Sequence, residues 1–216
     1  FYFFNYIIMS RYTSHRYHVN SKSKALSKVR NDDEEEDDEE ASEYNEISVQ
    51  DNNIYFYTDV NPKSALELVL AITDLTKKMR ILAITHNIPV PTITLHINSE
   101  GGEVHSALSV FDTIKRNPTP IKTIISGNAS SAATIISLAG HERAISQNSY
   151  MLIHNISINE FWGKMHEFDD EMKNLDNLMK LIKNIYKEYT SVKEEKLDEI
   201  LKHDIWWDAK KCKKFN

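Results

Sequence analysis

One short stretch combines hydroxyl side chains with small residues between two apolar segments, and it reads Gly127-Asn128-Ala129-Ser130-Ser131-Ala132-Ala133-Thr134. A glycine-led turn that places a serine at the start of a buried helix can present a nucleophile. Free backbone N–H groups and the positive end of the helix dipole would lie beside that serine and could hold an anion. A serine at this place is also a common helix cap, so the neighbouring segments must distinguish a nucleophile from a cap.

Strand-like segments lie on both sides of this turn. Upstream, residues 92–97 lead into Asn98-Ser99-Glu100-Gly101-Gly102-Glu103-Val104. Downstream, Tyr150-Met151-Leu152-Ile153-His154-Asn155 is an apolar strand with a histidine at its end. The chain therefore supplies a Gly-Gly turn, a serine turn and a histidine, each after a strand.

This order of segments resembles the proteolytic subunit of the Clp proteases. The motifs of that family are an Asn-Ser-Pro-Gly-Gly turn, a Gly-x-Ala-(small)-Ser turn and a Met-Ile-His segment. The spacing between Gly102 and Ser131 agrees with the family without a gap, and the resemblance covers residues 47–212. It implies a Clp protease/crotonase-like α/β fold, in which ββα units form a spiral and a long handle helix protrudes.

The pattern of apolar residues, glycines and prolines predicts the same class of fold without the resemblance. Strands are expected at 53–60, 92–97, 121–126, 143–146 and 149–154, and helices at 62–88, 103–116 and 131–139. Strands that alternate with helices in this way indicate an α/β fold with parallel strand pairing.

A long amphipathic helix is expected at residues 159–189. Its apolar side chains are Phe161, Met165, Phe168, Met172, Leu175, Leu178, Met179, Leu181 and Ile182. The resemblance implies that this helix is the handle, which projects from the head of the subunit and interdigitates with a second ring. The alternative is a long helix that packs on its own domain.

The resemblance assigns a Ser-His-Asp triad to three positions. Ser131, rather than Ser130, aligns with the nucleophile, and His154 aligns with the general base. Asp204 stands two residues before the aromatic Trp206 and so takes the place of the acid that orients the histidine. The carboxylates of Asp198 and Asp208 remain rivals for that third place.

The resemblance also implies an oxyanion hole made by the backbone N–H groups of Gly102 and Ala132. Several residues depart from the family pattern. Glu100 replaces the proline before the two glycines, Ala132-Ala133 replaces Met-Gly after the nucleophile, and Asn155-Ile156 replaces the common Gln-Pro after the histidine. The turn around residues 140–143 is also shorter than in typical members. We expect these changes to affect substrate preference and regulation more than catalysis.

Composition fits one domain with a tail. The chain has 216 residues, of which 41% are hydrophobic, and this suffices for a sizeable core. Its single cysteine, Cys212, excludes an internal disulfide and fits a reducing compartment. The histidines are scattered, so we expect neither a metal nor another cofactor in this subunit.

A cytoplasmic location is expected, with an organelle stroma or matrix as the alternative because residues 10–30 carry Arg and Ser but no acid.

Charge is concentrated at the N-terminus. Residues 1–31 carry basic and no acidic side chains, whereas residues 32–40 are all Asp or Glu. Such a run repels itself and buries nothing, so residues 1–46 are expected to be a disordered tail and residues 47–216 the peptidase domain. The first nine residues are apolar but fall short of the roughly 20 needed to cross a bilayer. No membrane or nucleic-acid partner is expected. By the resemblance, the family's last strand would follow Asn216, so the sequence is expected to be truncated there.

The resemblance implies a serine endopeptidase that degrades unfolded polypeptides inside a ring-shaped chamber. The subunits would form two stacked heptameric rings, and an AAA+ Clp unfoldase would use ATP to feed them. One alternative is a catalytically silent ring subunit that acts as a scaffold. A second is an enoyl-CoA hydratase-like enzyme, which shares the spiral architecture but has no need of a Ser-His-Asp set.

Overall fold

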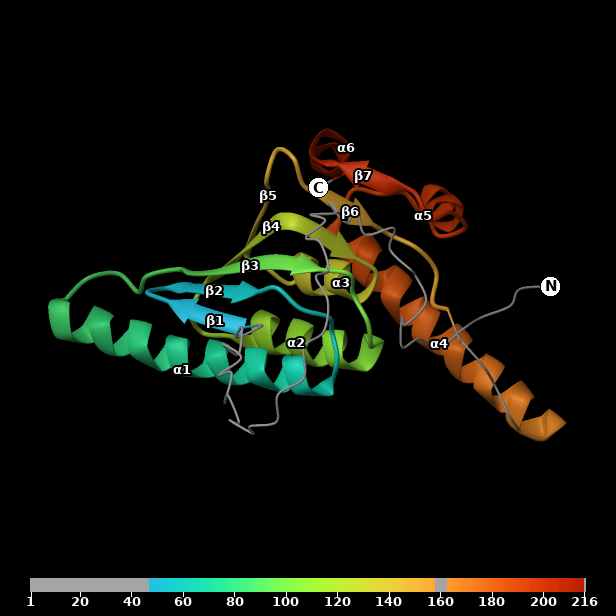
Figure 1. Cartoon of the computed structure of the whole chain (residues 1–216), viewed down its shortest axis with the longest axis horizontal. Helices are drawn as coiled ribbons and strands as arrows, with labels where there is room; N and C mark the ends of the chain where they lie inside the picture. Colours follow the sequence, from blue (N-terminus) through green and yellow to red (C-terminus); the bar gives the residue numbers. More distant parts are fainter. Residues whose placement is uncertain (1–46, 158–162, 216) are drawn as a thin grey trace, which may run out of the picture.

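One mixed sheet organises the chain. The computed structural model describes residues 47–157 and 163–215, and within them seven strands form a sheet in the order β1-β2-β3-β4-β6-β7, with β5 also paired to β4 (Figure 1). The strands are β1 (Ile47–Gln50), β2 (Asn53–Phe56), β3 (Ile93–Ser99), β4 (Ile121–Ser130), β5 (Glu142–Ile145), β6 (Tyr150–Leu152) and β7 (Trp206–Asp208). The pairs around β3 and β4 are parallel, while β1 and β7 run antiparallel to their neighbours. The parallel pairing predicted from the sequence is thus confirmed.

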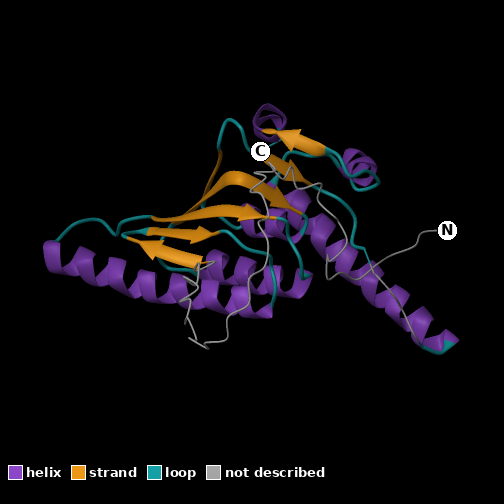
Figure 2. Cartoon of the chain, viewed as in Figure 1, coloured by secondary structure: helices purple, strands orange, loops and turns teal. Residues whose placement is uncertain are grey.

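A layer of helices covers one face of the sheet. The helices are α1 (Pro62–His86), α2 (Val104–Arg116), α3 (Ala132–Leu138), α4 (Met165–Tyr189), α5 (Glu194–Ile200) and α6 (Ala209–Lys214). In Figure 2, α1 and α2 lie side by side along one face of the sheet, and α3 continues this layer beneath β4. Alternate residues of β3, namely Ile93, Leu95 and Ile97, are fully buried. The core therefore lies between the sheet and the layer of α1, α2 and α3.

The ends of α1 follow directly from the sequence. The side chain of Asn61 accepts a hydrogen bond from Ser64 N at 2.9 Å, and the Ser64 hydroxyl accepts one from Asn61 N at 3.0 Å. This capping box and Pro62 in the first turn start the helix. Asn87, in the left-handed conformation at φ 53°, ends it.

The first predicted strand is shorter than expected, since β2 ends at Phe56 rather than at residue 60. The chain turns away there and brings Val60 beside the Gly-Gly turn. Val60 N donates to Gly101 O, and Glu103 N donates to Val60 O, both at 2.7 Å. The backbone N–H and C=O of Val60, which would have extended β2, instead hold the Gly-Gly turn that precedes α2.

The strand β4 is longer than predicted, because it pairs with two different strands in succession. Its first half pairs with β5, and residues 128–130 pair with β6. Gly127 joins the halves at φ 130°, and a Cβ at this position would lie 2.6 Å from Asn98 Oδ1. The Asn98 side chain accepts a hydrogen bond from Asn128 N at 3.0 Å, so glycine allows the close approach that fixes the second half of β4.

The long helix begins at Met165, six residues later than predicted, and residues 158–162 lie outside the described part of the chain. Figure 1 shows its N-terminal half extending away from the sheet, whereas its C-terminal end packs beside α3. The exposed fraction is 79% for Met165 but only 1% for Leu175 and 4% for Met179. The expectation that Leu175 and Met179 belong to a protruding apolar stripe is therefore wrong, because both side chains pack into their own domain.

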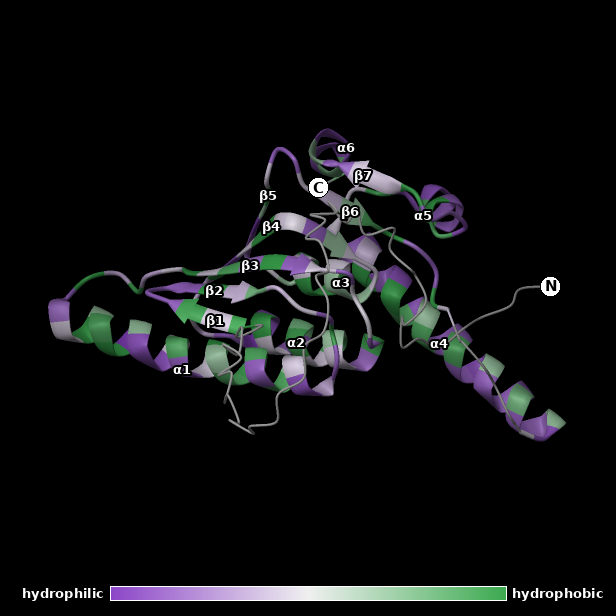
Figure 3. Ribbon diagram, in the orientation of Figure 1, coloured by the Kyte–Doolittle hydropathy of each residue, from purple (hydrophilic) through white to green (hydrophobic). Residues whose placement is uncertain are grey.

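Polar and apolar residues alternate around α1 and α4 in Figure 3, as expected of amphipathic helices. The predicted tail, residues 1–46, lies outside the described residues, as does Phe161 of the predicted handle.

Candidate active site

Ser131 lies between β4 and α3 in a strained backbone conformation. Its φ of 51° and ψ of −122° are unusual for a residue other than glycine. Ser131 N donates to Leu152 O at 2.8 Å, and Ser131 O accepts hydrogen bonds from Thr134 N at 3.0 Å and from Thr134 Oγ1 at 2.5 Å. Both sides of the residue are thus held by the surrounding structure, which is the condition for such strain to persist.

The two serines of the turn have different environments. Ser130 is completely buried, and its hydroxyl donates to Asn128 Oδ1 at 3.0 Å. Ser131 is partly exposed and lines a small pocket of about 30 Å³. No hydrogen bond to its Oγ occurs within the described residues, and the side chain does not cap the helix. Of the two hydroxyls, only that of Ser131 faces space that a substrate could enter.

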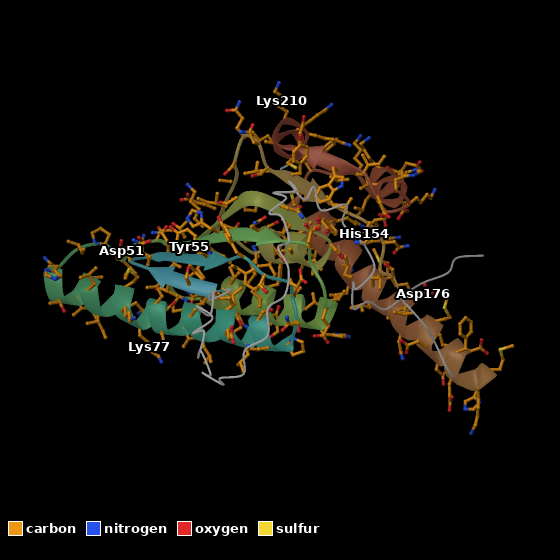
Figure 4. All side chains as sticks on the ribbon, in the orientation of Figure 1. Asp51, Tyr55, Lys77, His154, Asp176 and Lys210 are labelled. Carbon is orange, nitrogen blue, oxygen red and sulfur yellow. The ribbon has the colours of Figure 1, made fainter. Side chains whose placement is uncertain are left out.

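His154 lines the same pocket. It follows β6, which pairs in parallel with the end of β4 and so brings Leu152 opposite Ser130. Figure 4 shows His154 near the end of α4 that packs against the body. Its Nε2 is buried, and no described residue, Ser131 included, is a hydrogen-bond partner for that atom. The pair therefore shares one pocket without being bonded, as is common in sites that tighten only around a substrate.

Asp204 lies on the other side of the imidazole. Its Oδ1 is 3.3 Å from His154 Nδ1. Burial lowers the pKa of His154 below its ordinary value of 6.5, and the charge and hydrogen bond of Asp204 partly offset this effect. At neutral pH the ring is therefore uncharged. Its Nδ1–H can then donate to Asp204 and leave the lone pair of Nε2 directed toward the pocket.

The rival carboxylates are engaged elsewhere. Asp198 Oδ1 lies 2.6 Å from Lys183 Nζ, in an ion pair between α5 and α4. Asp208 caps α6, because its Oδ1 accepts from Lys211 N at 2.7 Å. The structure brings Asp204, and neither rival, next to His154.

The Gly-Gly turn packs directly against the serine turn. A Cβ on Gly101 would lie 2.5 Å from Ser130 O and 2.8 Å from Ser131 Cβ. Gly102 lines the pocket together with Ala132, and within the described residues neither backbone N–H has an acceptor. Two free N–H donors therefore border the same space as Ser131 and His154. This is the composition of an oxyanion site.

The remaining walls of the pocket are mostly apolar, and apart from Ile156 they were not identified from the sequence as part of the site. They include Ile135 of α3, Ile156, and Met179, Ile182 and Tyr186 of α4. In the sequence these α4 residues only mark an apolar helix face. Tyr186 lies on the same helix face as Met179 and Ile182. A tyrosine on an apolar face was the one signal in the sequence that a polar atom is buried there. Of the residues that depart from the family pattern, Glu100 is exposed, whereas Asn155 and Ile156 line the pocket.

Among the described residues, no group of three or more His, Cys, Asp or Glu side chains is arranged to hold a metal ion. No helix in that part of the chain is both long and apolar enough to cross a bilayer.

Comparisons with known proteins agree on one family. The sequence model of the Clp protease family matches residues 37–216. The chain is 30% identical over 165 residues to the ATP-dependent Clp protease proteolytic subunit 1 of Chlamydia caviae, a match that covers 75% of this chain and 82% of the relative. It is 26% identical over 138 residues to the ATP-dependent Clp protease proteolytic subunit of Deinococcus radiodurans, covering 63% of this chain and 67% of the relative.

A solved structure supports the fold. A ClpP1 mutant from Listeria monocytogenes superposes with a TM-score of 0.63 at 22% sequence identity, over 76% of this chain and 86% of the other. The chain belongs to the Clp protease family and, with it, to the serine peptidases of the Clp type. The family and fold class expected from the sequence are thus confirmed, whereas the roles of individual residues remain predictions.

Proposed function

We propose that this chain is a serine endopeptidase in which Ser131, His154 and Asp204 form the catalytic triad. The observation that carries the proposal is the shared pocket of Ser131 and His154, with Asp204 on the far side of the imidazole. A nucleophile, a neutral base and an orienting acid thereby stand in the order that acyl transfer needs.

Each group has a defined step. Ser131 Oγ attacks the scissile carbonyl carbon, and its proton passes to His154 Nε2. The N–H groups of Gly102 and Ala132 stabilise the oxyanion of the tetrahedral intermediate. His154 then gives the proton to the leaving amine, and water attacks the acyl-enzyme by the same steps in reverse. Asp204 accepts from Nδ1–H throughout and stabilises the imidazolium.

The proposal includes assembly into rings that enclose the site. Two exposed apolar surfaces support it. The N-terminal half of α4 carries Met165 and Phe168, which are 79% and 37% exposed. On α1, Leu66, Ile81 and Ile84 are 59%, 64% and 82% exposed. Surfaces of this kind on a folded domain usually mark contacts between proteins. Stacked heptameric rings would cover both and restrict access to Ser131.

Enclosure would also define the partners. Only extended chains could then reach the pocket, so the substrates would be unfolded polypeptides delivered by an ATP-dependent Clp unfoldase. This subunit itself would use no cofactor. The pocket's apolar walls, with Ile135 and Ile156 beside Ser131, favour an apolar substrate side chain next to the cleaved bond.

A short peptide with a fluorogenic amide leaving group tests the chemistry without an unfoldase. We expect the wild-type chain to hydrolyse it and Ser131→Ala to be slower by about a thousandfold or more. Ser130→Ala is the matched control and should keep most of the activity, because the Ser130 hydroxyl is buried and donates to Asn128 Oδ1. If Ser131→Ala hydrolysed the peptide at the wild-type rate, the proposed nucleophile would be wrong. Absence of hydrolysis by every form would instead favour the silent ring subunit.

A further inference from the structure

Two buried hydroxyl groups connect α4 to the start of α3. Tyr186 of α4 forms a hydrogen bond with Thr134 of α3, and Thr134 Oγ1 in turn bonds to Ser131 O. Tyr186 is 3% exposed and Thr134 is fully buried. Water therefore does not compete for these bonds, and the chain of hydroxyls ends on the backbone of the strained serine.

Each hydroxyl has one proton to donate, and this determines which group is the donor in each of the two hydrogen bonds. A carbonyl oxygen only accepts, so the single hydroxyl proton of Thr134 is directed at Ser131 O, 2.5 Å away. The Tyr186 hydroxyl must then donate to Thr134 Oγ1. Burial raises the pKa of Tyr186 to about 12, so the phenol keeps its proton at any pH at which the enzyme would work.

The carbonyl of Ser131 and the N–H of Ala132 are two ends of one peptide group. Because that group is planar and trans, the direction of its C=O fixes the direction of its N–H. Ser131 O is held toward α3 by Thr134, so the Ala132 N–H points the opposite way. Ala132 lines the pocket.

We propose that Tyr186 and Thr134 are positioning residues, which hold the Ser131–Ala132 peptide so that the Ala132 N–H is aimed at the oxyanion. This inference rests on the proposed function, because it takes Ser131 as the nucleophile. Tyr186 also lines the pocket, but the role proposed for it is that of its hydroxyl, which bonds to Thr134. Both act through the orientation of one peptide group at a strained φ, and they add to the backbone bonds that Ser131 N donates to Leu152 O and Ser131 O accepts from Thr134 N.

The test uses the full-length chain and four single variants. Tyr186→Phe and Thr134→Val each remove one hydroxyl with little change in volume, and Thr134→Ser keeps the hydroxyl. Tyr189→Phe is the matched control, because it removes a phenol hydroxyl from the same helix but not one that bonds to α3. For each we would measure kcat and KM on the fluorogenic peptide, inhibition by a peptide aldehyde, and the melting temperature.

A peptide aldehyde forms a tetrahedral adduct whose oxygen occupies the oxyanion site. We expect Tyr186→Phe and Thr134→Val to lower kcat and aldehyde affinity together by about five- to tenfold or more, with KM nearly unchanged. Thr134→Ser should restore activity close to the wild-type level, and Tyr189→Phe should match wild type. The double variant Tyr186→Phe/Thr134→Val should be no slower than Thr134→Val, because Tyr186 acts only through Thr134.

Different results separate the two proposals. If Ser131→Ala retained full activity, the proposed function would fail regardless of the Tyr186 result. If Ser131 proved essential but Tyr186→Phe and Thr134→Val kept wild-type kcat and aldehyde affinity, only the positioning role would be overturned. A lower melting temperature would also overturn the positioning role if kcat, measured below that temperature, were unchanged. This combination is expected of a bond that only stabilises the fold. Should Tyr186→Phe not fold, the comparison of Thr134→Val with Thr134→Ser decides.

Discussion

His154 Nδ1 lies 3.3 Å from Asp204 Oδ1, yet the histidine side chain is only 8% exposed while the aspartate side chain is 48% exposed. The proposed base is therefore inside the domain, where burial lowers its pKa, and the proposed acid lies at the surface, where solvent screens its charge. This asymmetry keeps the imidazole neutral. It leaves to Asp204 mainly the task of fixing which ring nitrogen carries the proton.

Replacing Asp204 with Asn should impair that task. The amide can present its NH₂ to Nδ1 and so favour the tautomer that carries its proton on Nε2, where it cannot act as a base. We expect Asp204→Asn to lower kcat by roughly a hundred- to a thousandfold with little change in melting temperature. Asp208→Asn is the control, because Asn also caps a helix and should leave kcat near the wild-type value. A greater loss in Asp208→Asn than in Asp204→Asn would show that the wrong acid has been assigned.

The pH dependence of kcat/KM should report the lowered pKa of His154. Activity requires the neutral ring, so the rate should rise with pH as the imidazolium loses its proton. Because burial lowers the pKa of His154, the midpoint of this rise should lie below 6.5. In Asp204→Asn the two contributions that raise the pKa are lost, and the residual activity should rise at still lower pH. A midpoint above 6.5 in the wild type, or a shift to higher pH in the variant, would contradict this account of the charge balance.

Gly101→Ala should damage the site without touching the triad. Its φ is 96°, and the added Cβ would lie within 2.8 Å of both Ser130 O and Ser131 Cβ. The serine turn or the Gly-Gly turn must then move, so we expect at least about a hundredfold loss of kcat/KM. The strained backbone should also cost roughly 1–3 kcal/mol in the free energy of unfolding. The exposed neighbour offers a control, and Glu100→Ala should change the free energy of unfolding little. Normal activity of Gly101→Ala would mean that the close packing of the two turns is unimportant.

The sequence predicted the parts of the fold that local chemistry decides. Pro62 and the prolines after α1 predicted the bounds of that helix to within a few residues, and in the structure Asn61 and Asn87 cap its two ends. The second half of β4 was not predicted, because it is a strand only by virtue of its pairing with β6. Leu175 and Met179 were assigned to an intersubunit surface for a similar reason. An amphipathic pattern shows that a helix face is buried but does not show by what.

The candidate site was predicted to a different extent at each residue. The residue types alone could not show whether Ser130 or Ser131 is the nucleophile, because two adjacent serines differ only in the direction in which the turn points their side chains. The resemblance made that choice, and the burial of Ser130 is consistent with it. The bond between Tyr186 and Thr134 could not be predicted, because it joins two helices through a contact between residues 52 positions apart.

The protruding half of α4 should govern assembly. We expect Phe168→Glu/Met172→Glu to break contacts between rings, because two charges would enter an apolar contact, and peptidase activity should fall while the domain stays folded. Asn174→Glu/Asn177→Glu adds the same charge at exposed polar positions of the same helix and should assemble as wild type. Sedimentation velocity distinguishes these states. A wild-type chain that sediments as a 25.1 kDa monomer at micromolar concentration would refute the ring proposal.

Covalent labelling followed by peptide mapping would show directly whether Ser131 is the nucleophile. A fluorophosphonate reacts with a serine only when a base activates that serine, so the mass of the adduct and its position identify the residue. We predict a single phosphonyl group on the wild-type chain, located on Ser131, retained in Ser130→Ala and absent from Ser131→Ala and His154→Ala. An adduct on Ser130, or undiminished labelling of Ser131→Ala, would contradict the account.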